Sequence, residues 1–326
     1  MNCNLRCKHC LLGDRLKSGE SIKKEVVIKI LEEGIAIGVK DVLFTGGEPL
    51  LHKDITEILS TATRFGYNTS INTNGTLITE TMAKTIASIG LSKVQVSVDG
   101  PKKIHEYIRG AGTFDRTLKG IRLLKEVGIK VYLNTQLTEQ LLEKENFDDY
   151  LSLLKSINPE FVQLTITASL GNARKYNITP IDYTKHAEFI KFLAEQLRLH
   201  VRERRKEHPE VACPAAFYEM AIDANGNSYP CHYFRGINQY SIGNVYNESL
   251  KDIWDRSLKT PLAEFVAGKI TNKECKNCSF LKSSSRCAAK IYSLYQRFDQ
   301  IDPMDCYLNR GIVNTDLKAL FNSFNM

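Results

Sequence analysis

The chain has 326 residues, 43% of them hydrophobic and 25% charged, which is the composition of an ordinary globular protein. It has no run of about 18 uninterrupted apolar residues, and its first residues show neither the charged nor the apolar region of a signal peptide, so we expect a cytoplasmic protein without a membrane partner. Part of the net charge of +7 lies in residues 198–206, where no aromatic residues interleave with the basic ones. We interpret this segment as the solvated basic end of a helix and expect no nucleic-acid partner.

Helical and strand patterns alternate from about residue 21. Ser21 is predicted to cap a first helix, and a short buried strand follows at 41–44. Further helices are predicted near 54–65, 79–89, 114–127 and 143–157, followed in turn by strands at 68–73, 93–99, 130–135 and 161–167, and a long helix is predicted from about residue 182. Such alternation favours parallel strands joined by crossover helices. We therefore predict an α/β barrel with its functional residues at the carboxyl ends of the strands.

The pattern changes after His208, where helices become scarce and turn residues appear. We therefore predict two domains, an α/β barrel at residues 1–208 and a smaller cysteine-rich domain at residues 209–326. The nine cysteines divide in the same way: three lie within residues 3–10 and six between residues 213 and 306. Because disulfides are rare in the cytoplasm, this clustering indicates metal binding.

The first three cysteines, Cys3, Cys7 and Cys10, have the spacing C-x3-C-x2-C. The residues alone leave several interpretations open: a zinc site short of one ligand, a redox pair with a third thiol beside it, or the packing of small apolar side chains. A loop of three thiolates also suits a cubane iron–sulfur cluster in which the fourth iron stays open. An open iron would imply a bound substrate or cofactor.

The stretch TGGEP at residues 45–49 follows the first predicted strand. Gly46 and Gly47 have no side chain, so the backbone there can approach a ligand closely, and Glu48 can balance a cationic amine. The alternative is an ordinary tight turn.

Three motifs in the same order along the chain, CNLRCKHC (3–10), TGGEP (45–49) and VSVDGPKKIHEYIRG (96–110), resemble the radical S-adenosylmethionine (SAM) enzymes of the branch that carries a C-terminal SPASM extension. The resemblance implies a partial (β/α)6 TIM-like barrel with a [4Fe–4S] cluster on Cys3, Cys7 and Cys10. This cluster would bind exchangeable SAM and cleave it reductively to a 5′-deoxyadenosyl radical.

The resemblance also assigns roles to polar residues of the barrel. Gly46, Gly47 and Glu48 would bind the methionine part of SAM, and Ser97 and Arg109 would contact its carboxylate. Asp99 alternates with valines and is expected on the same side of its strand as Ser97, facing a solvated interior. Asn72, Asn74 and Asn134 are candidates for contacts to ribose or substrate, or for turn caps.

The late cysteines form a second set. From the residues alone, Cys275, Cys278, Cys287 and Cys306 make a four-thiolate site for zinc or for a second cubane. The segments around them resemble the SPASM pattern, which implies an auxiliary [4Fe–4S] cluster. Full members of that branch have one more cysteine where this chain has Ile291. We therefore expect one auxiliary cluster, on those four cysteines.

Cys213, Cys231 and His232 are left as candidate catalytic residues. The two cysteines could be reduced core thiols, or one of them could donate a hydrogen atom. His232 could replace a missing ligand, act as a general acid or base, or simply be packed and hydrogen-bonded.

The chain departs from the family at its start as well, because only Met1 and Asn2 precede Cys3. Either the sequence is truncated or the barrel lacks its first strand. A short N-terminal peptide-recognition domain, common in peptide-modifying members, is also missing from this sequence.

For function, the resemblance implies a peptide or protein substrate, as in the maturation of a ribosomally synthesised peptide, and a flavodoxin or ferredoxin as electron donor. A tetrapyrrole or haem-pathway enzyme is the alternative, and sulfatase maturation is less favoured. An alternative of another class is a zinc-binding interaction protein without catalytic activity.

Overall fold

The computed structural model describes residues 2–17, 19, 21–166, 171–178, 213–267, 287–295 and 297–298. The helix predicted from residue 182, the domain boundary near residue 208, and Cys275, Cys278 and Cys306 lie outside the described residues.

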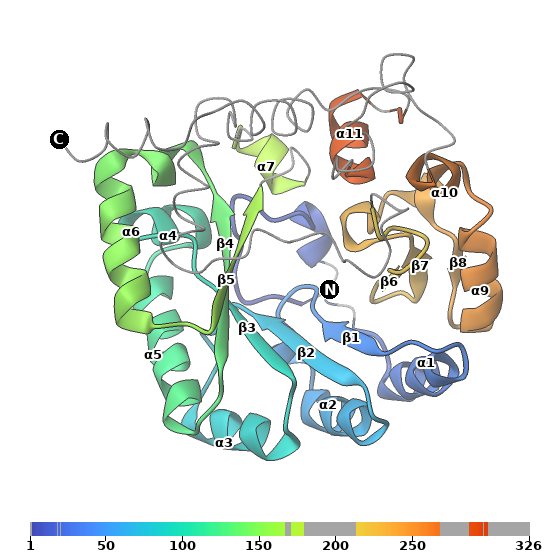
Figure 1. The fold of residues 1–326 in the computed structure, drawn as a ribbon, viewed down its shortest axis with the longest axis horizontal. Helices are drawn as coiled ribbons and strands as arrows, with labels where there is room; N and C mark the ends of the chain where they lie inside the picture. Colours follow the sequence, from blue (N-terminus) through green and yellow to red (C-terminus); the bar gives the residue numbers. More distant parts are fainter. Residues whose placement is uncertain are drawn as a thin grey trace, which may run out of the picture.

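Five parallel strands form one sheet in the order β1-β2-β3-β4-β5 (Figure 1). Their bounds are β1 Asp41–Phe44, β2 Asn68–Thr73, β3 Lys93–Ser97, β4 Val131–Leu137 and β5 Phe161–Ile166. The helices of this part are α1 Lys24–Ala36, α2 Ile55–Arg64, α3 Glu80–Ile89, α4 Lys102–Arg109, α5 Thr113–Glu126, α6 Lys144–Ile157 and α7 Asn172–Lys175, with 3-10 turns η1 Gly13–Lys17, η2 Pro49–Leu51 and η3 Glu139–Leu142. The predicted succession of five strands and their connecting helices is confirmed.

Two local predictions differ from the structure. Ser21 does not cap the first helix, because α1 begins at Lys24 with Lys23 in the capping position and no side-chain cap. Helix α4 was not predicted at all. It follows Pro101, which stands at its N-cap, and it buries Ile104 and Ile108 four residues apart, so one short apolar stripe is enough to hold it on the sheet.

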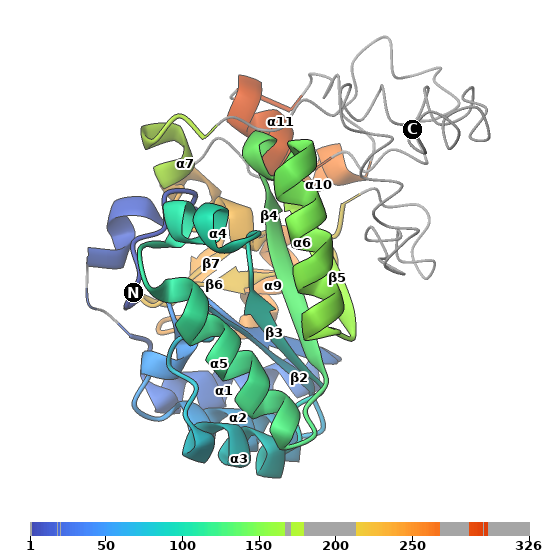
Figure 2. The same cartoon turned by 90° about the vertical axis from the view of Figure 1, so that its left-hand side faces the viewer.

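One face of the sheet is apolar and carries the helices. In neighbouring strands Val96 pairs with Leu133, and Leu133 pairs with Val162, so the apolar side chains form continuous rows across the sheet. Side chains from α2 to α6 pack on these rows, and Figure 2 shows α5 and α6 in front of the strands. Because side chains alternate along a strand, the residues between these apolar positions point to the opposite, helix-free face.

That opposite face is polar, and we call it the polar face of the sheet. Its polar side chains include Asn72, Gln95, Ser97, Asn134, Gln163 and Thr165, and Leu43, Tyr132 and Phe161 lie on the same face. A sheet with helices on one side and polar side chains on the other is the wall expected of a partial barrel with a solvated interior.

A C-terminal unit follows, built on a three-stranded antiparallel sheet in the order β6-β7-β8. Its elements are β6 Ala221–Ile222, β7 Asn227–Tyr229, β8 Gly243–Asn244, α9 Leu250–Ser257, α10 Pro261–Val266 and α11 Ala288–Tyr295, with 3-10 turns η4 His232–Phe234 and η5 Asn238–Tyr240. Helix α1 contacts this unit through two hydrogen bonds. The Lys29 ammonium donates to the carbonyl of Val245 at 3.1 Å, and the Glu33 carboxylate accepts from the Leu250 amide at 2.7 Å. In the described residues, no helix is both long and apolar enough to span a membrane.

Candidate functional site

Residues 2–12, which we call the cysteine loop, lie across the carboxyl ends of the parallel strands. The Asn2 carbonyl accepts the Glu48 amide at 2.8 Å beyond β1, and the Asn74 side chain donates to the Asn4 side chain at 2.9 Å beyond β2. Further along, the Lys8 amide donates to the carbonyl of Ile108 at 2.8 Å. The loop has no regular structure of its own, so these contacts with the sheet edge determine where its three thiols lie.

Gly47 makes the closest of these contacts. A Cβ atom at this position would lie 1.9 Å from the Asn2 carbonyl oxygen and 3.2 Å from the Cβ of Cys3. Both neighbours belong to the main chain or to its first side-chain atom, so they cannot move aside easily. Gly47 is therefore required for the cysteine loop to pack on this turn, a constraint that the motif alone did not reveal.

The Glu48 carboxylate ties the turn to β2. It accepts hydrogen bonds from the Thr73 hydroxyl at 2.7 Å, the Asn74 amide at 2.8 Å and the Leu50 amide at 3.1 Å. Burial raises the pKa of Glu48, and these three donors counteract that rise. The side chain expected to balance a cationic amine thus already binds three groups of its own chain.

A buried ion-pair network lies under the cysteine loop. The carboxylate of Asp99 is fully buried and binds Nε of Arg109 at 2.6 Å and Nε2 of His9 at 2.8 Å, and it accepts the amide of Gln136 at 2.9 Å. Burial alone would raise the pKa of Asp99, but the charges of Arg109 and His9 outweigh it and hold the pKa well below its usual range. Asp99 is therefore an anion that joins the loop, α4 and β4.

The expectation that Asp99 faces a solvated interior is wrong. Strand β3 ends at Ser97, so the alternation of side chains no longer applies two residues later. The chain turns there, and the Asp99 side chain has no exposed surface.

His105 of α4 is a neutral, buried histidine next to this network. Burial and the positive charge of Arg109 lower its pKa to about 4. Its Nδ1 accepts the Asp99 amide at 3.4 Å, and its buried Nε2 has no hydrogen-bond partner in the described residues. Its ring packs edge-on against Phe114 at 5.6 Å between centroids.

The pKa of His105 predicts a pH dependence of stability. The folded pKa of about 4 lies below the ordinary value of 6.5, so the unfolded chain takes up a proton first as the pH falls. Stability should be complete above pH 6.5 and should fall by about 3 kcal/mol between pH 6.5 and 4. In His105→Phe, urea unfolding measured across this range should lose most of that slope. An unchanged slope would show that another group is responsible.

Asn172 was not singled out from the sequence, yet it binds the backbone of two of the three candidate cluster ligands, Cys7 and Cys10. Its side-chain amide donates to the carbonyl of Cys7 at 3.0 Å, and its backbone amide donates to the carbonyl of Cys10 at 2.9 Å. A Cβ at the preceding Gly171, which has a φ of +55°, would lie 2.5 Å from the Cys10 carbonyl oxygen. The cysteine loop is thus clamped between the sheet edge and the start of α7.

Removing the Asn172 side chain should loosen this clamp. In Asn172→Ala the Cys7 carbonyl loses its donor, and we expect the protein to release iron severalfold faster to a chelator while it keeps its secondary structure. Asn146→Ala, which removes a partly exposed amide from α6, is the matched control and should release iron at the wild-type rate. Equal rates in the two variants would contradict this role of Asn172.

The thiols of the cysteine loop influence one another electrostatically. Burial raises the pKa of Cys7 to about 12, and the positive charge of Arg109 counteracts that rise. Negative charges on Cys10 and Cys3 would raise the pKa of Cys7 further, because the three thiols lie near one another. In the part of the chain that the structure describes, however, no three side chains of His, Cys, Asp or Glu form a group that could hold one metal ion. A cubane takes its three thiolates on three different irons, so its ligands lie further apart than those of a single zinc ion.

The predicted contacts on the polar face lie side by side across the sheet. Ser97 pairs in register with Asn134, whose side-chain oxygen accepts the Thr165 hydroxyl at 2.7 Å. The side-chain oxygen of Asn72 is buried and has no hydrogen-bond partner among the described residues. The polar face therefore offers hydrogen-bonding groups to a ligand beneath the cysteine loop.

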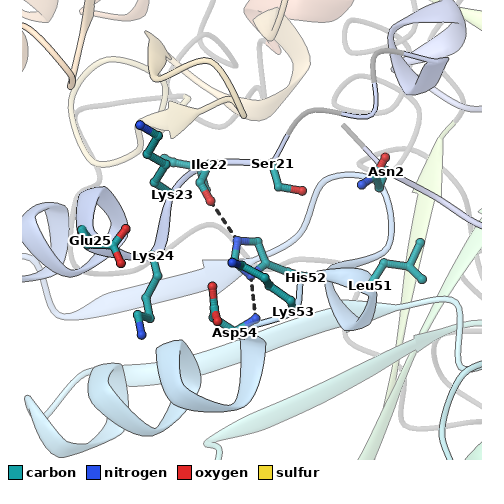
Figure 3. Close-up of a pocket in the computed structure, with 10 residues that line it drawn as sticks. All are labelled: Asn2, Ser21, Ile22, Lys23, Lys24, Glu25, Leu51, His52, Lys53 and Asp54. Atoms are coloured by element: carbon teal, nitrogen blue, oxygen red, sulfur yellow. Dashed lines mark hydrogen bonds between the residues drawn. The ribbon is translucent and has the colours of Figure 1, made fainter.

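A pocket of about 370 Å³ lies beside Asn2 of the cysteine loop, between the segments that precede α1 and α2 (Figure 3). It is lined by Asn2, residues 21–25 and residues 51–54. His52 bridges the two segments, because its Nε2 binds the carbonyl of Ile22 at 2.8 Å and its Nδ1 accepts the amide of Asp54 at 3.1 Å. Lys23, Lys24 and Lys53 surround this pocket.

In the C-terminal unit, Cys287 lies beside Cys213 and Cys231. The two earlier cysteines are buried in one apolar cluster, and Cys287 packs against it. Burial raises the pKa of Cys213 to about 12, and a charge on Cys287 would raise it further. From the sequence, Cys287 was grouped with cysteines that lie outside the described residues, and this neighbourhood was not predicted. Ile291, one turn further along α11, is almost fully buried in the same cluster, where an apolar side chain packs in place of the expected thiol.

His232 is only partly buried, and its Nδ1 lies 3.0 Å from the Glu219 carboxylate. Its ring also packs against Tyr233, with 4.2 Å between centroids. Glu219 was not singled out from the sequence.

Comparison with known proteins decides the family. The model of the radical SAM superfamily matches residues 1–157, and the SPASM model, an iron–sulfur cluster-binding domain, matches residues 213–279. The chain belongs to the radical SAM superfamily. Among curated relatives it is similar to the AdoMet-dependent heme synthase of Nitratidesulfovibrio vulgaris, with 25% identity over 95% of this chain and 90% of the relative.

Two solved structures share the fold of this radical SAM protein. SuiB of Streptococcus suis bound to its precursor peptide SuiA superposes with a TM-score of 0.75 at 21% identity, covering 93% of this chain and 73% of SuiB. Native anSMEcpe with bound AdoMet superposes with a TM-score of 0.74 at 19% identity, covering 99% of this chain and 96% of that protein. The predicted fold class, a partial TIM-like barrel with a C-terminal SPASM domain, is confirmed.

Membership in the superfamily also confirms the predicted enzyme class and cofactors. Radical SAM domains use a [4Fe–4S] cluster with SAM, and the SPASM domain binds an auxiliary iron–sulfur cluster. The interpretation as a non-catalytic zinc protein is not supported.

Proposed function

We propose that this enzyme matures a peptide or protein: Cys3, Cys7 and Cys10 hold the [4Fe–4S] cluster that cleaves SAM, and hydrogen is abstracted from a substrate side chain. The bound cluster and SAM supply an electron and a 5′-deoxyadenosyl radical, which is reactive enough to remove hydrogen from an unreactive carbon. The proposal rests mainly on the position of the cysteine loop. The loop forms hydrogen bonds with residues that follow three of the parallel strands, and the buried Arg109 lies near its thiols.

In this proposal, Arg109 binds the methionine carboxylate of SAM. Asp99 holds its Nε, and within the described residues its two terminal nitrogens make no hydrogen bond. A guanidinium fixed in this way can bind a carboxylate through both terminal nitrogens. Ser97, at the end of β3, lies on the same edge and would donate a further hydrogen bond.

The remaining predicted residues shape or line the site. Gly46, with a φ of +140°, turns the chain after β1, and Gly47 lets the cysteine loop pack on that turn. We assign Glu48 to holding the turn on β2, because it already accepts three hydrogen bonds from its own chain. Asn72 and Asn134 on the polar face would orient ribose or substrate and keep the reacting carbon within reach of the radical.

A peptide fits the polar face better than a tetrapyrrole does. At the carboxyl ends of the strands its polar side chains are neutral amides and hydroxyls, which suit the amide groups of a peptide, and Leu43, Tyr132 and Phe161 add apolar surface on the same face. The cation on this face among the described residues is Lys93, which lies 5.0 Å from the ring centroid of Tyr132. Tetrapyrrole precursors of haem carry several carboxylates, which would call for more basic groups. The fold shared with SuiB, crystallised with its peptide, adds support.

A haem-pathway reaction is the second candidate, favoured by the similarity to the AdoMet-dependent heme synthase along almost the whole chain. One experiment separates the two. The reconstituted enzyme is given SAM, dithionite and either a candidate precursor peptide or an iron-bound coproporphyrin, and 5′-deoxyadenosine and substrate mass are measured. We expect the peptide to raise 5′-deoxyadenosine formation and to lose hydrogen. The same changes with the porphyrin alone would favour the second candidate.

We further propose that an acidic flavodoxin or ferredoxin supplies the electron from the side of the pocket in Figure 3. Lys23 and Lys53 at this pocket are complementary to such a donor, whereas Lys24 pairs with Glu57 and the side chains of Glu25 and Asp54 also line the pocket. Asn2, which lines it, also anchors the cysteine loop. Changing Lys23 and Lys53 to Glu should lower turnover with flavodoxin severalfold and leave turnover with dithionite unchanged. Equal turnover with flavodoxin would contradict this docking site.

A further inference from the structure

Lys93 places a positive charge at the amino end of the polar face. It is the first residue of β3, and because side chains alternate along a strand, it points away from the helix-covered side on which Val94 and Val96 are buried one at a time along the strand and its neighbours. Its ammonium lies 5.0 Å from the ring centroid of Tyr132 and 5.9 Å from that of Phe161. All three of these side chains keep part of their surface exposed. Because an aromatic ring has no net charge, the two rings orient the ammonium but do not neutralise it.

Neighbouring side chains complete a surface that suits an anion. Ser70 of β2 lies in register with Lys93, so its hydroxyl can donate close to the ammonium, and the hydroxyl of Tyr132 is a further donor. Leu43 of β1 lies in register with Ser70 and is 50% exposed, and with Phe161 it adds apolar surface. A cation with hydroxyl donors and apolar surface beside it matches a carboxylate carried on a short hydrocarbon stem.

The position of Lys93 on β3 sets its distance from the reaction site. Ser97, which would donate a hydrogen bond to SAM, is the last residue of the same strand. At the rise of a β-strand, the two residues are about 13 Å apart. An extended peptide covers this distance with about four residues. The charge at Lys93 therefore lies where a side chain some four positions from the modified residue would reach it.

We infer that Lys93, with Ser70 and Tyr132 beside it, is a subsite for one carboxylate of the substrate, and that this carboxylate is an aspartate or glutamate about four residues from the modified one. A single cation suits a single acidic side chain better than the several carboxylates of a tetrapyrrole. The inference rests on the proposed function for the source of the carboxylate, since a tetrapyrrole would also bring one.

The test measures the binding of short fluorescent peptides to the anaerobically reconstituted full chain in the presence of SAM. The peptides consist of alanine and serine and carry one glutamate, or one glutamine or lysine at the same position, which is moved along the peptide. Wild type should bind the best glutamate peptide about tenfold more tightly than its glutamine counterpart, and Lys93→Gln should remove this difference. Lys93→Glu should reverse the preference, so that the lysine peptide binds more tightly than the glutamate peptide.

A second lysine provides the matched control. Lys130 is exposed, directly precedes β4 and pairs with Glu160, so Lys130→Gln should bind all peptides as wild type does. Iron-bound coproporphyrin serves as the other carboxylate probe. Tenfold weaker binding of the porphyrin alone in Lys93→Gln would keep the carboxylate subsite and contradict peptide maturation. Unchanged affinity of Lys93→Gln for both probes, or a Lys93→Glu variant that still prefers glutamate, would overturn the inference. If Lys93→Glu fails to fold, the comparison of both probes between wild type and Lys93→Gln still decides the question.

Discussion

Replacing Gly47 with alanine is expected to reduce SAM cleavage by about 100-fold or more, since small displacements of reacting groups already cost that much. The added methyl group would lie 1.9 Å from the Asn2 carbonyl oxygen, so the cysteine loop would have to leave the turn. The hydrogen bond between Asn2 and the Glu48 amide would be lost with it. Iron content should fall by about four per chain in the reconstituted protein, because the loop would no longer hold its cluster.

Gly66→Ala is the matched control for this prediction. Gly66 has a φ of +86°, and a Cβ there would meet nothing within 4 Å. The variant should lose about 1 kcal/mol of stability from backbone strain and keep its iron and its activity. Wild-type iron content in Gly47→Ala would show that the loop does not depend on this contact.

The second large effect concerns Asp99. In Asp99→Ala the guanidinium of Arg109 stays buried without its counter-charge, and the free energy of unfolding should drop by about 3–5 kcal/mol. Urea unfolding at neutral pH measures this change. His9 would lose the same partner, so the cysteine loop should also release iron faster.

The exposed ion pair between Lys251 and Asp255 on α9 provides the comparison. Asp255→Ala should leave the unfolding midpoint nearly unchanged, because solvent screens such pairs. Similar midpoints for the Asp99 and Asp255 variants would contradict the structural role of Asp99.

The pH dependence separates Asp99 from His105. The pKa of Asp99 is lower in the folded protein than in the unfolded chain. Its contribution to the free energy of unfolding is therefore complete above the usual pKa of a carboxyl group, and it is lost only as the pH falls below that value. A loss of stability between pH 6.5 and 4 therefore comes from His105 and not from Asp99.

The strands and most helices could be predicted because their signals are local. The strand NTSINT was placed at 68–73 and is found there, since buried Thr69, Ile71 and Thr73 alternate with less buried neighbours. Helix α4 was missed because its apolar stripe is short and follows a proline.

The candidate site was predicted as a set of motifs, but not as a set of contacts. Asn172 binds the Cys7 carbonyl across 165 positions, which no local pattern can indicate. The neighbourhood of Cys287 was missed for the same reason, because spacing associates it with the nearby C-x2-C pair, whereas the fold brings it to Cys213 and Cys231. Glu219 carries no sequence signal until its distance to His232 is known.

The central claim is that the cysteine loop, fixed on the carboxyl edge of the sheet, holds the cluster that cleaves SAM. The most direct measurement compares the anaerobically reconstituted wild type with the variant in which Cys3, Cys7 and Cys10 are all alanine, counting iron and 5′-deoxyadenosine formed with SAM and dithionite. The account predicts that the variant lacks about four irons per chain and forms no 5′-deoxyadenosine. Undiminished 5′-deoxyadenosine formation in that variant would contradict it.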